Sequence, residues 1–277
     1  MPKDNEERNE EEYMALLAIF KRFISHRDDE GAKLAILEEL MAKRADYAVR
    51  YACDGFGISY EEALELLKST DELSELDTER RKILLAAFDN LVDFSVAEEY
   101  QMMMDLPEED EDEDEDEDEF VAVFVEYNHR YAKVENSDIE YAMMVAASLI
   151  TVKNTTILTY MTQGDERVRP WNRQYEGVTA PKSSFPAWLI PPIEHMCRCY
   201  LIEDDVMDSL QVQAAKKSPA GLKMPDWFNP TFKESVALGG RIFSDEHPYF
   251  QVDPEHNATL QLISKRIKNV YFNGTSS

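Results

Sequence analysis

Three residues late in the chain have the types and spacing of metal ligands. His195, Cys197 and Cys199 stand at alternating positions, and imidazole and thiolate are the usual ligands of zinc. The single residue between the cysteines is a tight spacing for one metal, because structural sites usually separate them by about two to four residues. A further ligand would have to come from His129, His247, Asp165 or Asn172. Zinc is the one cofactor that these residues suggest; otherwise the thiols pack as small hydrophobic groups or act as nucleophiles.

A second group, Asp165, Arg167 and Arg169, also alternates along the chain. On a continuing strand these side chains share one face, where an aspartate beside two guanidinium groups forms a bidentate ion-pair network. We interpret this network as structural, because the glycines and prolines around it need something to hold them. The alternative is a site for an anionic ligand.

The turn His247-Pro248-Tyr249 is a third candidate. A His-Pro-aromatic turn is typical of packing, and the sequence contains none of the usual motifs of hydrolases, phosphate-binding loops or zinc peptidases. An enzyme would have to use Arg167, Arg169 and His247 for anion binding and acid–base work. We expect no enzymatic activity and no small-molecule substrate.

The elements that must position these residues divide the chain into three parts. Residues 1–106 carry four amphipathic stripes joined by short loops, which predict a helical bundle. Ser59 opens the third helix through a capping box, and Asp77 is expected to cap the fourth. No chemistry is evident in this part, and His26 and Cys53 are expected to be structural.

An acidic segment follows at residues 107–119. It contains twelve consecutive acidic residues, which repel one another and predict a disordered linker. The simplest role is a solvated spacer. The alternatives are a decoy for a basic partner surface and a weak sink for divalent ions.

The remaining residues, 120–277, predict a mixed domain with a small irregular sheet and a C-terminal helix. Strands are expected at residues 120–125, 155–162, 178–179 and 198–202. Helices are expected from a capping box at Ser137, over residues 204–216 and from Asp253-Pro254. The buried stripe of the last helix is predicted to be Leu260, Ile263, Ile267 and Val270. The fold class is therefore α+β.

The charge balance restricts the partners. The net charge of −27 disfavours a surface that binds DNA by neutralising phosphates, so packaged DNA would be contacted indirectly at most. Residues 141–152, the longest uncharged apolar stretch of a helical region, are too few for a membrane span, and no secretory signal is visible. Three cysteines make no disulfide framework and fit a reducing cytosol.

The order of residues between 162 and 200 resembles a known family. Thr-x-x-Asp-x-Arg-Val-Arg-Pro is followed by Gly177, then by Pro191-Pro192, and then by Cys-Arg-Cys at residues 197–199. This order resembles the C-terminal domain of the Mu F-like minor head proteins of tailed bacteriophages, which are head morphogenesis proteins. The segment that ends with His247-Pro248-Tyr249 is similar to the end of that domain, so the resemblance covers roughly residues 137–250.

The sequence departs from the family pattern at two polar positions. The family often has histidine where Asn172 and Glu194 stand here, and the histidine after the proline pair is displaced to His195. If the family domain holds a metal, the resemblance implies that this chain holds it poorly or not at all. The residues of the motif that are expected to form ion pairs, Asp165, Arg167 and Arg169, are in contrast all present.

The resemblance implies a structural protein present in few copies in the phage virion. It would be synthesised in the cytoplasm of the bacterial host. It would then lie in the head interior or at the portal vertex, bound to the portal or to other head and neck proteins. Head assembly and DNA ejection are the implied functions. A zinc-stabilised module and a toxin-like enzyme packaged with the genome are the alternatives.

Overall fold

The computed structural model describes residues 5–26, 29–107, 113–203 and 216–272. The first part of the chain forms four helices: α1 (Asn5–Ser25), α2 (Glu30–Phe56), α3 (Tyr60–Lys68) and α4 (Glu75–Met104). Each long helix turns an apolar stripe inward, and Leu16, Leu40 and Phe88 lie at the centre of the resulting core. The four helices expected in this part are confirmed.

Local hydrogen bonds explain where these helices begin. The Ser59 hydroxyl accepts the backbone N–H of Glu62, and the Glu62 carboxylate accepts the N–H of Ser59, so the predicted capping box is confirmed. The prediction for α4 is wrong by one turn. Its N-cap is Ser74, whose hydroxyl accepts the backbone N–H of Asp77 at 3.1 Å. Asp77 occupies the N3 position, where a carboxylate favours the helix terminus without being the cap.

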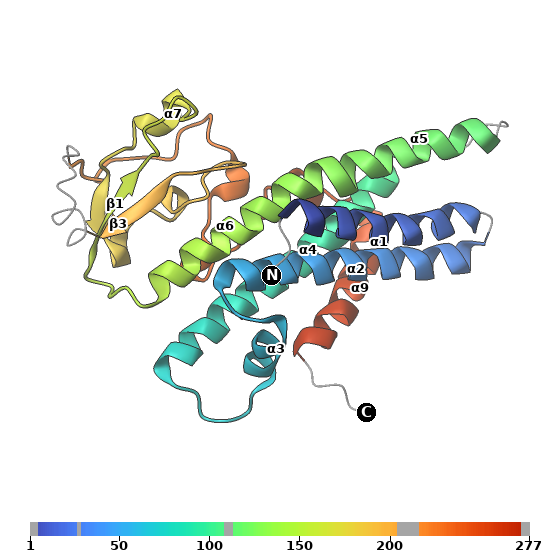
Figure 1. The fold of residues 1–277 in the computed structure, drawn as a ribbon, viewed down its shortest axis with the longest axis horizontal. Coiled ribbons are helices and arrows are strands. Elements are labelled where there is room, and N and C mark those ends of the chain that lie inside the picture. Colours follow the sequence, from blue (N-terminus) through green and yellow to red (C-terminus); the bar gives the residue numbers. More distant parts are fainter. Residues whose placement is uncertain (1–4, 27–28, 108–112, 204–215, 273–277) are drawn as a thin grey trace.

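A long helix connects the two ends of the molecule (Figure 1). It comprises α5 (Glu113–Val125), the π-helical turn η1 (Glu126–Tyr131) and α6 (Ala132–Ile150). The predicted strand at residues 120–125 is therefore wrong. Phe120 and Phe124 are four residues apart, so the helix places both on its buried face, and the Phe124 ring stacks on Phe20 at 4.6 Å. Ser137 lies inside α6, so the capping box predicted there starts no helix.

The acidic segment is helical where it is described. Residues 113–119 form the first turns of α5, which contradicts the predicted disordered linker for these positions. Residues 108–112 of the predicted linker lie outside the described residues.

A small sheet lies at the other end of the long helix. Strands β1 (Ile157–Met161), β2 (Thr179–Pro181) and β3 (Tyr200–Glu203) form an antiparallel sheet in the order β2-β1-β3. The short helix α7 (Pro170–Arg173) and the turns η2 (Lys182–Ser184) and η3 (Ala187–Leu189) lie between the strands in sequence. The fold class α+β is confirmed, and the three strands fall within two residues of their predicted positions. The helix predicted at 204–216 lies almost wholly outside the described residues.

The chain then returns to the helices. Turns η4 (Pro230–Phe232), η5 (Val236–Leu238) and η6 (Pro248–Phe250) lead to α9 (Pro254–Phe272), which packs on α3 and α4. The predicted start at Asp253-Pro254 is confirmed. The buried apolar stripe of α9 consists of Leu260, Ile263, Ile267 and Tyr271. Val270 was predicted to be in this stripe but is 57% exposed, because the next helical position toward α4 is residue 271, whose ring meets Phe88 edge-on.

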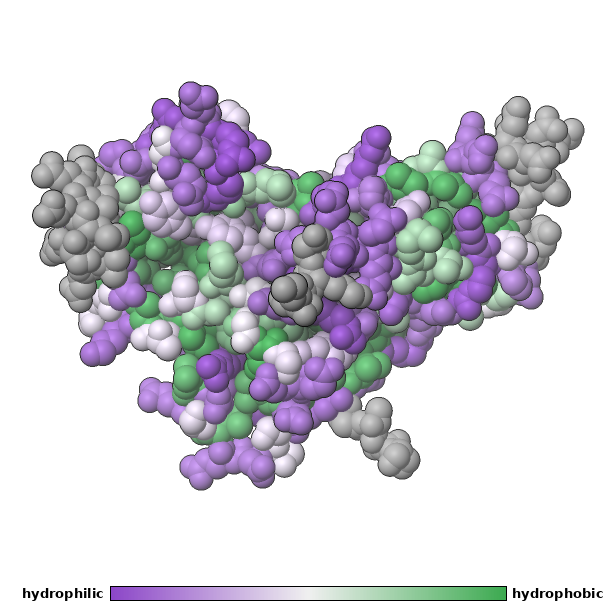
Figure 2. Space-filling model, viewed as in Figure 1, coloured by the Kyte–Doolittle hydropathy of each residue, from purple (hydrophilic) through white to green (hydrophobic). Residues whose placement is uncertain are grey.

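The hydrophobic core runs through both parts of the chain. Helix α6 packs along α2, and α9 packs along α4, so elements on both sides of the predicted boundary at residue 120 share one set of buried contacts. The outer surface mixes charged and apolar residues, with a strongly hydrophilic cap around α7 (Figure 2). None of the described helices is both long and apolar enough to span a membrane.

Candidate functional site

Asp165 is the centre of the ion-pair site, but its main partner is an arginine that the sequence analysis did not include. Arg198, from the Cys-Arg-Cys segment, donates to both Asp165 oxygens, at 2.9 and 2.8 Å. The backbone N–H of Arg167 donates to the same carboxylate at 3.0 Å. These hydrogen bonds, above all those from Arg198, lower the pKa of Asp165 to about 2. The carboxylate therefore stays charged at any physiological pH.

The predicted three-residue network forms only in part. The Arg167 side chain lies 3.7 Å from Asp165 and is 79% exposed. Arg169 does not contact Asp165; its Nη1 pairs with Glu194 at 2.7 Å and also donates to the His195 carbonyl at 3.2 Å. The reason is geometric. Strand β1 ends at Met161, and the chain then turns through residues 165–168 instead of continuing as a strand.

Glu194 is the second centre of the site. In addition to Arg169, it accepts the indole N–H of Trp171 at 2.9 Å and a hydrogen bond from the Asn172 amide. Asn172 is buried, so this bond satisfies a polar group that has little access to water. The two positions at which the sequence departs from the family pattern, Asn172 and Glu194, therefore contact each other.

The three predicted zinc ligands do not form one group. The Nδ1 of His195 lies 2.8 Å from a carboxylate oxygen of Asp138 on α6. Asp138 also accepts the backbone N–H of Met196 at 2.7 Å, and burial raises the pKa of Asp138. Among the described residues, no group of three or more His, Cys, Asp or Glu side chains is placed to hold a metal ion.

Cys197 and Cys199 are buried side by side. Their thiols form a hydrogen bond, which raises the pKa of Cys197 well above its usual value, with burial as the second cause. The same bond lowers the pKa of Cys199. Both cysteines belong to the hydrophobic core. Of the further ligand candidates, His129 lies in η1, its ring is 4.9 Å from the Tyr13 ring and tilted to it, and its Nε2 is 3.8 Å from Glu10.

The remaining motif residues shape turns. His247 is the N-cap of η6 and accepts the backbone N–H of Tyr249 at 3.2 Å; Pro248 is the first residue of that turn. Burial lowers the pKa of His247 to about 3, so its ring is neutral. Gly177 has a φ of 84°, a backbone conformation that other residues rarely adopt, and its N–H donates to the carbonyl of Tyr160 in β1. Pro191 and Pro192 are joined by a cis peptide bond.

The most extensive charged cluster lies inside the helical core, where the sequence analysis placed no chemistry. The Arg44 guanidinium from α2 is fully buried and bonds Glu98 of α4 at 2.8 Å, Glu12 of α1 at 2.9 Å and Glu135 of α6 at 3.3 Å. Burial raises the pKa of all three glutamates, and it raises the pKa of the neighbouring Glu99 to about 8. The available signal was a charged residue inside an apolar helical stripe. The sequence gives no indication of which carboxylates meet it.

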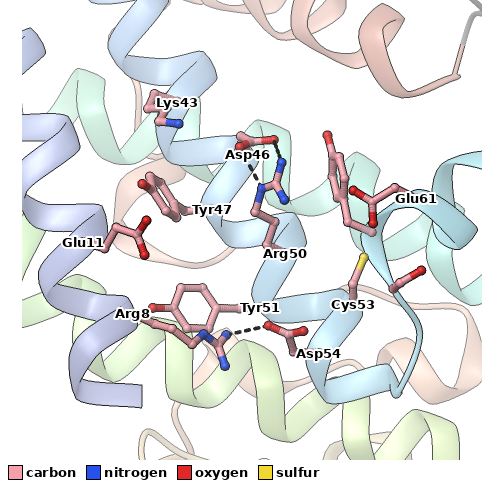
Figure 3. Close-up of a pocket in the computed structure, with 12 residues that line it drawn as sticks. Arg8, Glu11, Lys43, Asp46, Tyr47, Arg50, Tyr51, Cys53, Asp54 and Glu61 are labelled. Atoms are coloured by element: carbon pink, nitrogen blue, oxygen red, sulfur yellow. Dashed lines mark hydrogen bonds and ion pairs between the residues drawn. The ribbon is translucent and has the colours of Figure 1, made fainter. Parts of the chain in front are cut away.

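A surface groove of about 510 Å³ lies over α1, α2 and α3 (Figure 3). Its cations are already engaged. Arg8 pairs with Asp54 at 2.9 Å, and Arg50 pairs with Asp46 at 2.9 Å. Three cations of the groove stack on tyrosine rings: Arg8 on Tyr51, Lys43 on Tyr47 and Arg50 on Tyr60. These contacts fasten α1 and α3 to α2, and they account for the polar lining without a ligand.

Comparison with models of protein families, with curated proteins and with solved structures finds no match to this chain.

Proposed function

We propose that the chain is a structural minor head protein of a tailed bacteriophage, acting in head assembly or DNA ejection. The observation that supports it is the Asp165–Arg198 fork. It joins the Asp-x-Arg-Val-Arg segment to the Cys-Arg-Cys segment, the two parts of the sequence that resemble the Mu F-like domain. Two segments whose spacing alone suggested a family signature are thus one bonded unit around the end of the sheet.

The charged groups of this unit serve to hold the backbone. Asp165 fixes Arg198 and the turn at Arg167, while Glu194 fixes Trp171, Asn172 and Arg169. A residue set built for chemistry would instead leave an acid, a base or a nucleophile facing a cavity. This arrangement favours a binding and structural role. The partners, the portal or other head and neck proteins, and the location, the head interior or portal vertex, are proposed from the family resemblance alone.

The enzyme alternative has weaker support. It requires His247 to work with Arg167 and Arg169, but His247 is 5% exposed, neutral and packed against Phe94 and Phe243. The zinc-stabilised alternative requires His195 beside the two thiols, and His195 is bonded to Asp138.

Mass spectrometry of purified particles tests the proposal. Virions and empty head precursors of the phage, or of the induced prophage, that encodes the chain would be purified on density gradients and digested. We expect peptides from this chain in at least one kind of particle at a low ratio to the major capsid protein. Absence from every particle and precursor, in preparations that contain the portal protein, would refute the proposal.

A complementation assay tests whether the Asp165–Arg198 ion pair is needed for the proposed function. A phage deleted for this gene would be supplied with the wild-type chain, an Arg198→Ala variant or an Arg130→Ala control. Arg130 is an exposed arginine in η1, and its pair within the described part of the chain is with Glu126, one turn away. We expect the Arg198 variant to lower the yield of infectious particles and the control to leave it unchanged.

A further inference from the structure

All three tryptophans of the chain gather in one aromatic cluster beside α7. The Trp171 and Trp227 rings are 6.3 Å apart, Trp227 lies 6.2 Å from Tyr175, and Trp188 contacts Tyr175 edge-on at 5.3 Å. Tyr175 is buried, whereas Trp171 is 43% and Trp227 is 49% exposed. The cluster therefore runs from the buried Tyr175 out to the solvent, where it ends in the exposed indole rings of Trp171 and Trp227.

Arginines and a methionine lie in the segments joined to these rings. Arg173 is on α7 with Trp171, and its side chain donates to the Asp165 carbonyl, two residues before the exposed Arg167. Met196, which is 55% exposed, follows Glu194, the residue that accepts the Trp171 indole N–H. A shallow pocket of about 260 Å³ in these loops is lined by Arg167, Met196 and Cys199, among others. We name Trp171, Trp227, Met196, Arg167 and Arg173 the tryptophan–arginine surface. Tryptophan, methionine and arginine are the residues most enriched at the centres of protein interfaces.

The surface is held in place before any partner arrives. Glu194 accepts the indole N–H of Trp171, which fixes the orientation of the ring. Met196 has a φ of 57°, which is unusual for a residue with a side chain, and the buried Asp138 holds its backbone N–H. This conformation turns the methionine side chain outward into solvent. Groups fixed in this way lose little conformational entropy on binding.

The charge of this region differs from that of the rest of the molecule. Residues 162–200 contain five lysines and arginines and four acidic residues. One of the five, Lys182, is bonded to backbone carbonyls at the end of α6, so the other charges of this region sum to zero in a chain of net charge −27. Two of the carboxylates, Asp165 and Glu194, are bonded to Arg198 and Arg169. The Arg167 guanidinium is largely exposed, and the Nη2 of Arg173 donates to the backbone carbonyl of Asp165.

We infer that the tryptophan–arginine surface binds an acidic segment of a partner protein. In this complex the apolar side chains of the partner pack on Trp171 and Trp227, and its carboxylates pair with Arg167 and Arg173. A protein partner fits better than nucleic acid, because two available arginines neutralise few phosphates and the surrounding molecule is strongly acidic. The inference rests on the proposed function only for the expectation that the partner is a protein. It can hold for a chain that is absent from virions, so the two can fail separately.

Intrinsic fluorescence provides the test, because every tryptophan of the chain lies in the cluster. The purified full chain would be titrated with a synthetic dodecapeptide of aspartates and glutamates that contains two leucines. We expect a saturable change in tryptophan emission that weakens as salt is raised. Three further probes show which kind of ligand the surface prefers: the same peptide with lysines in place of the acidic residues, a peptide of residues 108–119, and a dT12 oligonucleotide.

Variants link the signal to the surface. We expect Trp171→Ala to weaken binding about 10-fold or more, as truncation of a central interface aromatic does, and Arg167→Glu to weaken it about 5-fold or more. Two matched controls lie elsewhere: Leu262→Ala on α9, which removes an exposed apolar side chain, and Arg130→Glu in η1. Both should bind like the wild type. Circular dichroism checks that each variant is folded, and Trp227→Phe repeats the test if Trp171→Ala is not.

Several outcomes would overturn the inference. Absence of saturable binding, or equal binding by wild type and Trp171→Ala, excludes this surface. Tighter binding of dT12 than of the acidic peptide assigns the surface to nucleic acid. Preferential binding of the 108–119 peptide, together with a concentration-dependent dimer in light scattering that Arg167→Glu dissociates, assigns it to a second copy of the chain.

Discussion

The buried arginine of α2 gives the sharpest prediction about stability. Among the described residues, Arg44 is the cation that pairs with Glu12, Glu98 and Glu135, whose carboxylates come from three other helices. Replacement by methionine keeps much of the side-chain volume and removes the positive charge. It leaves three buried carboxylates without this partner, where ionisation is costly.

The expected loss is large. Removing one partner from a buried ion-pair network costs about 3–5 kcal/mol, and a domain of ordinary stability has about 5–15 kcal/mol in total. Urea unfolding followed by circular dichroism at neutral pH would measure it. We expect the free energy of unfolding of Arg44→Met to fall by about 3–5 kcal/mol with little change in the m value. The loss should shrink at lower pH, because protonation removes the charges that the arginine balances.

Two comparisons make this prediction specific. Arg130→Met changes an exposed pair with Glu126 one turn away in η1 and should cost less than about 1 kcal/mol. Adding Glu98→Gln and Glu135→Gln to Arg44→Met should restore part of the stability, since the uncompensated charges disappear. A loss below about 1 kcal/mol for Arg44→Met, equal to that of the Arg130 control, would refute a structural role for the buried cluster.

Three further predictions follow from particular contacts. Burial raises the pKa of Glu99 to about 8 from 4.5, so the folded chain holds a proton that the unfolded chain releases between these values. Stability should therefore decrease as pH rises through this window, and Glu99→Gln should reduce the slope of the unfolding free energy by up to about 1.4 kcal/mol per pH unit. An unchanged slope would contradict the assignment. A Cβ at Gly55 would lie 2.1 Å from a backbone carbonyl of α6, so Gly55→Ala should lower the unfolding free energy by about 1–3 kcal/mol in urea titrations; a neutral effect would show that α2 and α6 can separate freely. Asp165→Asn weakens the fork to Arg198, so hydrogen exchange at residues 162–173 should accelerate while exchange in α4 stays unchanged; equal rates would mean that the fork does not hold this loop.

Local sequence signals predicted the elements whose ends depend on nearby residues. The capping box at Ser59 and the Asp-Pro start of α9 are interactions within about one turn, so a local pattern was enough to predict them. The similar pattern at Ser137 lies inside α6 and starts no helix, so even a local pattern needs the surrounding fold to take effect. The β-branched run that became β1 was also clear from composition. The run at residues 120–125 was not, because a short apolar segment fits a strand or a buried helix equally well. Packing against α1, through Phe20 and Phe124, decided for the helix.

For the candidate site, the sequence by itself singled out Asp165, Arg167 and Arg169, and the tertiary structure decided which charges meet. Arg198 was visible only as the middle residue of Cys-Arg-Cys, and its pairing with Asp165 depends on a turn after β1 that brings residues 33 positions apart into contact. The same holds for Arg44, whose hydrogen-bond partners lie up to 92 residues away. Side-chain spacing along a chain specifies a shared face only while the local structure continues. Where the chain turns, the contacts depend on how whole elements pack, and no local pattern records that.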